Sequence, residues 1–323
     1  MAVTSTTRQQ WSDQVREYRD AAGHVLHYVH VTHPGARGLV IHFSAFFGEW
    51  GDARQYRAAF QGHFHRLRML GDVVDFDWLF VCDEYGADGN GTYYTGEAGD
   101  FFVERAVTEV ITTVMESSAR SASETVTMGS SMGATAALKF GLQFGVRGIV
   151  AISPHVDLDV CAQRQGRWRH VAFICPDGDP VSSQNHRYTR QVRRIIDEWG
   201  EPQPPPRLFV QACRDDEGVF GEQVEPLSLA WAAAGGSVAL DARRSGGHTS
   251  EHATRPLLLD AVDCLLDGRP IDVTRYQRER TFRGRPASVG AWRNARTMGG
   301  RILRALRLRG RPGTRTDHAD RRG

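Results

Sequence analysis

The sequence predicts an α/β protein with a mostly parallel, eight-stranded sheet and helices on both of its faces. Three observations lead to this fold class. The chain has 323 residues and 41% of them are hydrophobic, which suffices for one large domain or two small ones. Short β-rich runs alternate with segments of helical periodicity along the chain. Most of these runs are continuously apolar, which is typical of strands that helices cover on both sides.

The expected strands begin with a hairpin and continue at intervals that leave room for helices. They are Val15–Asp20, Val25–Val31, Gly38–Ala45, Trp78–Gly86, Glu124–Gly129, Gly148–His155, Arg207–Asp216 and Ser237–Arg244. The first two strands pair as an antiparallel hairpin. The others are joined by helical segments, so right-handed parallel crossovers are expected.

Helices are expected wherever apolar residues recur every three to four positions between these strands. They are Gln55–Leu70, Phe101–Ser117, Ala134–Phe144, Val224–Ala234 and His252–Leu266. The stretch 156–206 is longer than one crossover needs, and we interpret it as an insertion after the sixth strand. It holds an apolar run at His170–Cys175, a helix around Tyr188–Trp199 and the stiff, proline-rich linker Glu201–Pro206.

The strand–helix pattern weakens beyond Gly268, so we divide the chain into a catalytic domain, 1–268, and a basic tail, 269–323. From Ile271 onward there are 15 arginines and four acidic residues, which leaves the rest of the chain at −9 because the total is +2. Apolar residues such as Trp292 and Leu306 recur at helical spacing, so part of the tail is expected to be an amphipathic helix and its end disordered.

Three roles for this tail stay open: a solubilising segment, a helix for an anionic membrane surface, and a docking arm for a polyanion or an acidic partner. Specific nucleic-acid binding is not expected, because no recognisable reading module accompanies the charge. The five cysteines form no CxxC pair, and no apolar leader or membrane span is evident. We therefore expect a reducing, cytoplasmic location, peripheral at the membrane if the tail binds lipid, and no metal site.

The stretch TMGSSMGATAALKFG contains a G-x-S-x-G pattern centred on Ser131. A buried strand precedes it and a helix follows it at once. Such a strand–turn–helix holds the central serine above the sheet, and the small residues Gly129 and Gly133 let the backbone pass without clashes. Ser131 is therefore the candidate nucleophile, whereas Ser130 is interpreted as a small turn residue.

His248 is the candidate base, because it lies in a glycine-rich loop between the last strand and the last helix. His252, about one helical turn further on, is the alternative. The acid that orients the imidazole should follow the strand RLFVQA, where Asp215 and Asp216 are adjacent. Asp215 is preferred and Asp216 is close behind; Asp177 and Asp179 in the insertion are weaker alternatives.

An oxyanion hole needs two backbone N–H donors. Met132, the residue after the nucleophile, should supply one of them. The loop after the third strand should supply the other, most plausibly through Ser44 or through its neighbours Phe43 and Ala45.

The chain order serine, aspartate, histidine at the ends of the fifth, seventh and eighth strands resembles the α/β-hydrolase superfamily, over about Val15–Leu266. This resemblance implies that superfamily's fold. One departure stands out, because HFSAFFGEW replaces the usual glycine-rich oxyanion loop. Its side chains Phe43, Ala45, Phe46 and Phe47 should make this wall of the substrate pocket bulky.

The sequence also resembles, more weakly, hydrolase-like proteins of bacterial surface-polysaccharide and accessory-secretion systems. The segments CDEYGADGNGTYYTGEAG (Cys82–Gly99) and GSSMGATAALKFG carry this resemblance, which implies acyl transfer to carbohydrate. Tyr93 and Tyr94 in the first segment are expected to contact a polar or sugar-like substrate; a solvated loop is the alternative.

The function expected from the sequence is that of a serine-dependent acyl hydrolase, esterase-like, that forms an acyl-enzyme on Ser131 and needs no cofactor. One alternative is a carbohydrate O-acyltransferase of surface-polysaccharide biosynthesis. Another is a non-catalytic binding protein of the same fold. The substrate is expected to be a small-molecule or glycan acyl compound.

Overall fold

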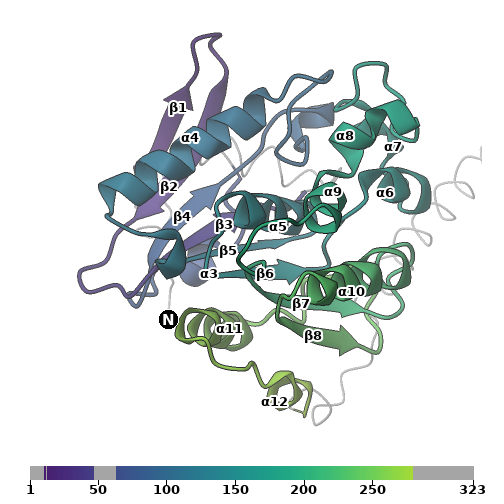
Figure 1. Cartoon of the computed structure of the whole chain (residues 1–323). Coiled ribbons are helices and arrows are strands. Elements are labelled where there is room, and N and C mark those ends of the chain that lie inside the picture. The colour runs from purple at the N-terminus through teal and green to yellow at the C-terminus, as the bar shows by residue number, and fades with distance from the viewer. Residues whose placement is uncertain (1–10, 12, 47–62, 279–323) are drawn as a thin grey trace, which may run out of the picture. The chain divides into compact units, whose positions relative to one another are not determined.

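The computed structural model describes residues 11, 13–46 and 63–278. One sheet of eight strands runs through these residues, in the order β1-β2-β4-β3-β5-β6-β7-β8 (Figure 1). The strands are β1 (Val15–Arg19), β2 (Val25–Val31), β3 (Leu39–Phe43), β4 (Asp77–Val81), β5 (Thr125–Ser130), β6 (Gly148–Ile152), β7 (Arg207–Cys213) and β8 (Val238–Arg243).

The sheet is mostly parallel, as the sequence predicts. β1 and β2 form an antiparallel hairpin, and β2 pairs antiparallel with β4. From β4 onward all neighbours are parallel. The carboxyl ends of β5, β7 and β8 therefore meet at one edge, where loops that follow them can place side chains together.

Two apolar cores lie on opposite faces of the sheet, because successive side chains of a strand point to opposite sides. In β3, Leu39 and Ile41 join one core while Val40 joins the other. In β6, Ile149 and Val150 divide in the same way. This double burial is the physical reason for the continuously apolar runs of the sequence.

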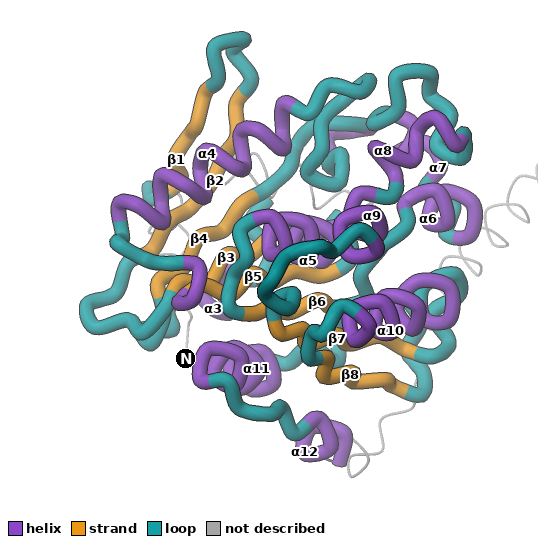
Figure 2. Tube along the Cα trace, in the orientation of Figure 1, coloured by secondary structure: helices purple, strands orange, loops and turns teal. Residues whose placement is uncertain are grey.

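Helices cover both faces (Figure 2). The first core is closed by α4 (Phe102–Ser117), α5 (Met132–Gln143), α6 (Leu158–Arg164), α7 (Trp168–Ala172), α9 (Gln191–Asp197) and α10 (Glu225–Ala233). The second is closed by α3 (Leu67–Leu70) and α11 (Arg255–Asp267). The short α8 (His186–Thr189) lies between α7 and α9 in the chain, and a π-helical segment, η4 (Phe220–Val224), leads into α10.

Three expected segments differ from the structure in detail. Of the predicted helix Gln55–Leu70, residues 55–62 lie outside the described part, and helix α3 begins only at Leu67 because Arg66 is left-handed, with φ 63°. The apolar run His170–Cys175 continues α7 into a turn. The helix expected around Tyr188–Trp199 is broken at Arg190 into α8 and α9.

A short helix, α12 (Val273–Arg278), follows α11 and packs near β8. Tyr276 is buried, and the Gln277 amide donates a hydrogen bond to Asp241 at 2.8 Å. The rest of the predicted tail, 279–323, with its expected amphipathic helix, lies outside the described residues. Within the described ranges, no helix has the length and apolar character needed to cross a membrane.

Candidate active site

Ser131 lies in the sharp turn between β5 and α5, with φ 52° and ψ −121°. Such a backbone is costly for a residue other than glycine, and it persists only where the surroundings enforce it. The N–H of Ser131 is held by the carbonyl of Ile152 at 2.8 Å. This is the geometry that exposes a serine side chain at the edge of a sheet.

Both flanking glycines are required by close backbone contacts. A Cβ atom on Gly129 would lie 2.0 Å from the carbonyl oxygen of Gly133. A Cβ atom on Gly133 would lie 2.2 Å from the carbonyl oxygen of Phe43. The start of α5 is therefore packed directly against the end of β3, and neither position can carry a side chain without a shift of the backbone.

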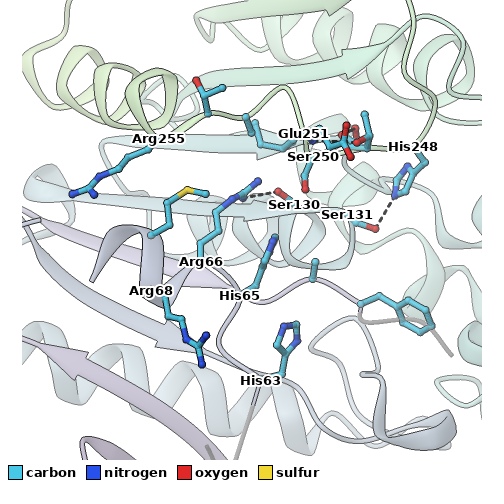
Figure 3. Close-up of a pocket in the computed structure, with 18 of the residues that line it drawn as sticks. His63, His65, Arg66, Arg68, Ser130, Ser131, His248, Ser250, Glu251 and Arg255 are labelled. Atoms are coloured by element: carbon cyan, nitrogen blue, oxygen red, sulfur yellow. Dashed lines mark hydrogen bonds between the residues drawn. The ribbon is translucent and has the colours of Figure 1, made fainter. Parts of the chain in front are cut away.

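Three side chains from separate loops converge at this turn. The Oγ of Ser131 is 2.8 Å from Nε2 of His248, and Nδ1 of His248 is 2.8 Å from Oδ2 of Asp216 (Figure 3 shows the first of these contacts). A carboxylate only accepts, so Nδ1 of His248 carries the proton and Nε2 is free to accept from the serine hydroxyl. This chain of hydrogen bonds can activate a hydroxyl as a nucleophile.

Asp216, rather than the preferred Asp215, is the carboxylate against His248. Asp216 is 3% exposed. Asp215 is exposed and accepts hydrogen bonds from the N–H groups of Gly246 and Gly247, at 3.1 and 2.9 Å. Partial desolvation opposes ionisation there, but these N–H groups lower the pKa of Asp215. Asp215 therefore anchors the loop that carries His248 through two backbone hydrogen bonds. The alternative base, His252, bonds the carbonyl of Ser245.

A second layer of polar side chains, which the sequence analysis missed, lies behind this set. The amide nitrogen of Gln165 donates to Oδ1 of Asp216 at 3.0 Å, so its oxygen faces Nε2 of His155, 2.6 Å away. Nε2 of His155 must then carry a proton, and Nδ1 can accept from the Tyr93 hydroxyl at 3.2 Å. The imidazole of His155 also stacks on that of His248, with centroids 4.7 Å apart.

Burial, with a smaller contribution from His248, holds the pKa of His155 well below its usual range. His155 is therefore a neutral ring that supports His248. Its place at the end of the sixth strand could have drawn attention to it; for Gln165, in the insertion, the sequence offers no signal.

Ser44 cannot be the second oxyanion donor, which corrects that expectation. Its N–H pairs with the carbonyl of Val81 at 3.1 Å, so the pairing with β4 extends one residue past β3. Its hydroxyl donates to the carbonyl of His63 and accepts from the N–H of His65. Ser44 is also 1% exposed.

The N–H groups of Met132 and Ala45 have no acceptor among the described residues. Met132 is the first residue of α5, so its N–H lies at the positive end of that helix. Because Gly133 touches the backbone of Phe43 and Ser44, these two free N–H groups come from adjoining segments. They form the candidate oxyanion hole.

A cavity of about 950 Å³ opens beside Ser131 and His248. Ala45 and Phe46 are among its lining residues, and their role in binding substrate stays a prediction. Phe47 lies outside the described residues. Phe43, Tyr93 and Tyr94 do not line the cavity, which corrects those three predictions: each is at most 2% exposed. Phe43 packs on Tyr94 and Phe140 in the first core.

The loop that carries the two tyrosines turns inward because a buried carboxylate organises it. Asp83 accepts hydrogen bonds from the N–H groups of Tyr85, Thr92 and Tyr94, and burial raises its pKa although these bonds oppose the shift. Residues 90–96 of this loop are thus buried rather than solvated, and no residue of the loop lines the cavity.

Ser130 is buried, and its hydroxyl accepts a hydrogen bond from Nη1 of Arg66 at 2.7 Å. It points away from the hydrogen bond between Ser131 and His248 (Figure 3). Among the described residues, no group of His, Cys, Asp and Glu side chains is arranged to hold a metal ion.

No family model matches the chain, and a search of curated proteins finds no match either. Solved structures do match. A capsule O-acetyltransferase of Neisseria meningitidis serogroup A is 17% identical, with a TM-score of 0.59, over 77% of this chain and 94% of that one. A glycosylation-associated protein complex from Streptococcus agalactiae is 16% identical, with a TM-score of 0.59, over 84% of this chain and 47% of that one.

The acylaminoacyl peptidase of Pyrococcus horikoshii is 12% identical, with a TM-score of 0.57, over 81% of this chain and 43% of that one. The capsule O-acetyltransferase and the peptidase are α/β-hydrolase-like, so the predicted resemblance to that superfamily is confirmed for the fold.

Proposed function

We propose that this protein is a serine-dependent acyl hydrolase that uses Ser131 as its nucleophile. The observation that carries the proposal is the hydrogen-bonded series from Ser131 through His248 to Asp216, with 2.8 Å at each step. The serine at its start has a strained backbone and lies beside an open cavity. The strain is consistent with a site whose geometry serves a reaction.

In the proposed reaction, Oγ of Ser131 attacks the acyl carbonyl carbon while its proton passes to Nε2 of His248. Asp216 holds the imidazole in the tautomer that can accept this proton and stabilises the imidazolium. The N–H groups of Met132 and Ala45 donate to the oxyanion. The imidazolium then protonates the leaving group, and an ester of Ser131 remains.

In the second half of the reaction, His248 takes a proton from the acceptor, whose oxygen attacks the acyl-enzyme. The acceptor is water in a hydrolase and a substrate hydroxyl in a transferase. No metal or organic cofactor takes part in this scheme.

A carbohydrate O-acyltransferase is the second candidate. The likeness to a protein named as a capsule O-acetyltransferase favours it. The two candidates share the acyl-enzyme and differ only in the acceptor. They separate when an acyl-enzyme is formed from an aryl ester with and without sugars, because an acceptor hydroxyl speeds release of the acyl group only in a transferase.

The test of the shared chemistry is hydrolysis of 4-nitrophenyl acetate by the wild type and by Ser131→Ala. We expect the variant to lose at least about 10³-fold in kcat. Ser130→Ala is the matched control, because it removes the neighbouring hydroxyl and leaves the hydrogen bond from Ser131 to His248. A non-catalytic binding protein would instead give equal, background rates for all three proteins.

A further inference from the structure

Arg66 is a buried cation beside the candidate nucleophile. Its side chain lines the cavity, yet the residue is only 8% exposed. Nη1 donates to the hydroxyl of Ser130, the residue before Ser131. Figure 3 shows Arg66 on one side of the serine pair and His248 on the other.

No described carboxylate compensates this charge: Arg66 forms no ion pair within residues 13–46 and 63–278. Burial lowers its pKa to about 10, so the guanidinium is still charged at neutral pH. A serine hydroxyl is a neutral acceptor and cannot balance it. A buried charge without a partner is energetically costly, so a ligand that supplies the opposite charge would be stabilised beside Arg66.

The rest of the cavity wall adds positive charge. Arg167 lies over the ring of Phe46, with 4.4 Å from its guanidinium carbon to the ring centroid. Arg68 and Arg255 also line the cavity, and Glu251 is the one acidic residue among its described lining. Arg255 differs from Arg66, because it is paired with Asp72 at 3.1 Å. Among the described residues, Arg66 and Arg167 are the lining arginines for which no partner carboxylate is found, and Arg66 is the one that contacts the serine pair.

We propose that the substrate carries an oxyanion, a phosphate or a carboxylate, that binds the guanidinium of Arg66 while its acyl group lies at Ser131. This inference rests on the proposed function and names its substrate class. Arginine has five N–H donors in a planar fork that fits either anion, and only one is used by Ser130. His65 also lines the cavity. Burial lowers its pKa to about 3, so it is neutral at pH 7 and adds no second positive charge beside Arg66.

Calorimetric titration with pyrophosphate and, separately, with malonate tests this site at constant ionic strength. The wild type should bind at least one of them, and the preferred anion identifies the source as phosphate or carboxylate. Arg66→Met should weaken that binding by about tenfold or more, because a charge-assisted bidentate contact is lost. Arg66→Lys, which keeps the charge without the fork, should lie between them.

Arg255→Met is the matched control, since it removes the same charge from the same cavity but from a residue already paired with Asp72. We expect it to cost at most about threefold, as for a solvent-screened charge. Thermal unfolding checks that each variant is folded. Absence of anion binding to the wild type, or equal losses in Arg66→Met and Arg255→Met, would overturn the inference.

Labelling of Ser131 by a neutral fluorophosphonate probe separates this inference from the proposed function. The preferred anion should slow labelling of the wild type and have at least about tenfold weaker effect on Arg66→Met. If Ser131 is never labelled, the proposed function fails, whereas the calorimetric result still stands or falls by itself. If labelling occurs and neither anion slows it, only the oxyanion inference fails.

Discussion

Replacing Asp216 by Asn tests how the imidazole of His248 is held. The carboxylate of Asp216 accepts two hydrogen bonds, from Nδ1 of His248 at 2.8 Å and from the amide of Gln165 at 3.0 Å. The two donors reach different oxygens of Asp216, and an Asn amide has an NH₂ group in place of one of these oxygens, so it can accept from only one of the two positions. Its NH₂ group must face either Gln165 or His248.

Each arrangement is costly. If the NH₂ group faces His248, it favours the tautomer with the proton on Nε2, which cannot accept the proton of Ser131. If it faces Gln165, two donors meet in a site that is 3% exposed. Gln165 cannot simply turn over, because its oxygen accepts from His155. We expect kcat/KM to fall by about 10³- to 10⁴-fold, or about 4–5.5 kcal/mol of transition-state stabilisation.

Asp215→Asn is the matched control, because it changes the adjacent carboxylate in the same way. Its side chain is exposed and can still accept from one of the two N–H groups that Asp215 now binds. We expect kcat/KM to fall by less than about tenfold. The assay is hydrolysis of 4-nitrophenyl acetate, with thermal unfolding to compare stability. A larger loss in Asp215→Asn than in Asp216→Asn would refute the reasoning.

Three further predictions follow from other parts of the molecule. Gly133→Ala should lower the unfolding free energy by about 1–3 kcal/mol in urea denaturation, because its Cβ would lie 2.2 Å from a backbone oxygen; unchanged stability would contradict the packing. Burial and nearby charges hold the pKa of His42 well below its usual range. As the pH drops below about 6.5, His42 is therefore protonated in the unfolded chain but not in the folded protein, and stability should fall. His42→Leu should reduce that fall by about 1.4 kcal/mol in total in denaturation series between pH 7.5 and 5.5, and an unchanged fall would exclude this role. Truncation after Arg278 should spare α12 and leave hydrolysis of 4-nitrophenyl acetate unchanged. Of the three roles left open for the tail, membrane binding predicts that truncation weakens sedimentation with anionic vesicles, and equal sedimentation would exclude it.

The fold class could be predicted from the sequence because the central strands, β3 to β7, are buried on both faces. Continuous apolar runs such as those of β3 and β6 have no other simple explanation, and the glycines around Ser131 are required by backbone contacts. The meeting of the loops after β5, β7 and β8 also follows from topology, since parallel strands end at one edge.

The choice between Asp215 and Asp216 did not follow from the sequence. Both residues lie in one tight turn, in which the N–H of Asp216 bonds the carbonyl of Cys213. Which side chain points inward depends on the turn, not on composition. The failure of Ser44 as a donor has a similar cause, because one more ladder bond to Val81 uses its N–H.

Burial that depends on contacts between residues far apart in the sequence could not be predicted either. Tyr93 and Tyr94 lie in a glycine-rich, polar loop that reads as a surface segment, yet the carboxylate of Asp83 draws its backbone inward. The proposed role of Arg66 depends on the lack of a carboxylate partner among the described residues. No local pattern in the sequence indicates this.

The central claim is that Ser131 is an activated nucleophile, and the most direct test is to locate a covalent adduct. The protein is treated with a fluorophosphonate and digested, and the modified residue is identified by mass spectrometry. We predict one adduct, on Ser131, which is lost in Ser131→Ala and strongly slowed in Asp216→Asn. An adduct on Ser130 or elsewhere, or none in the folded wild type, would contradict the claim.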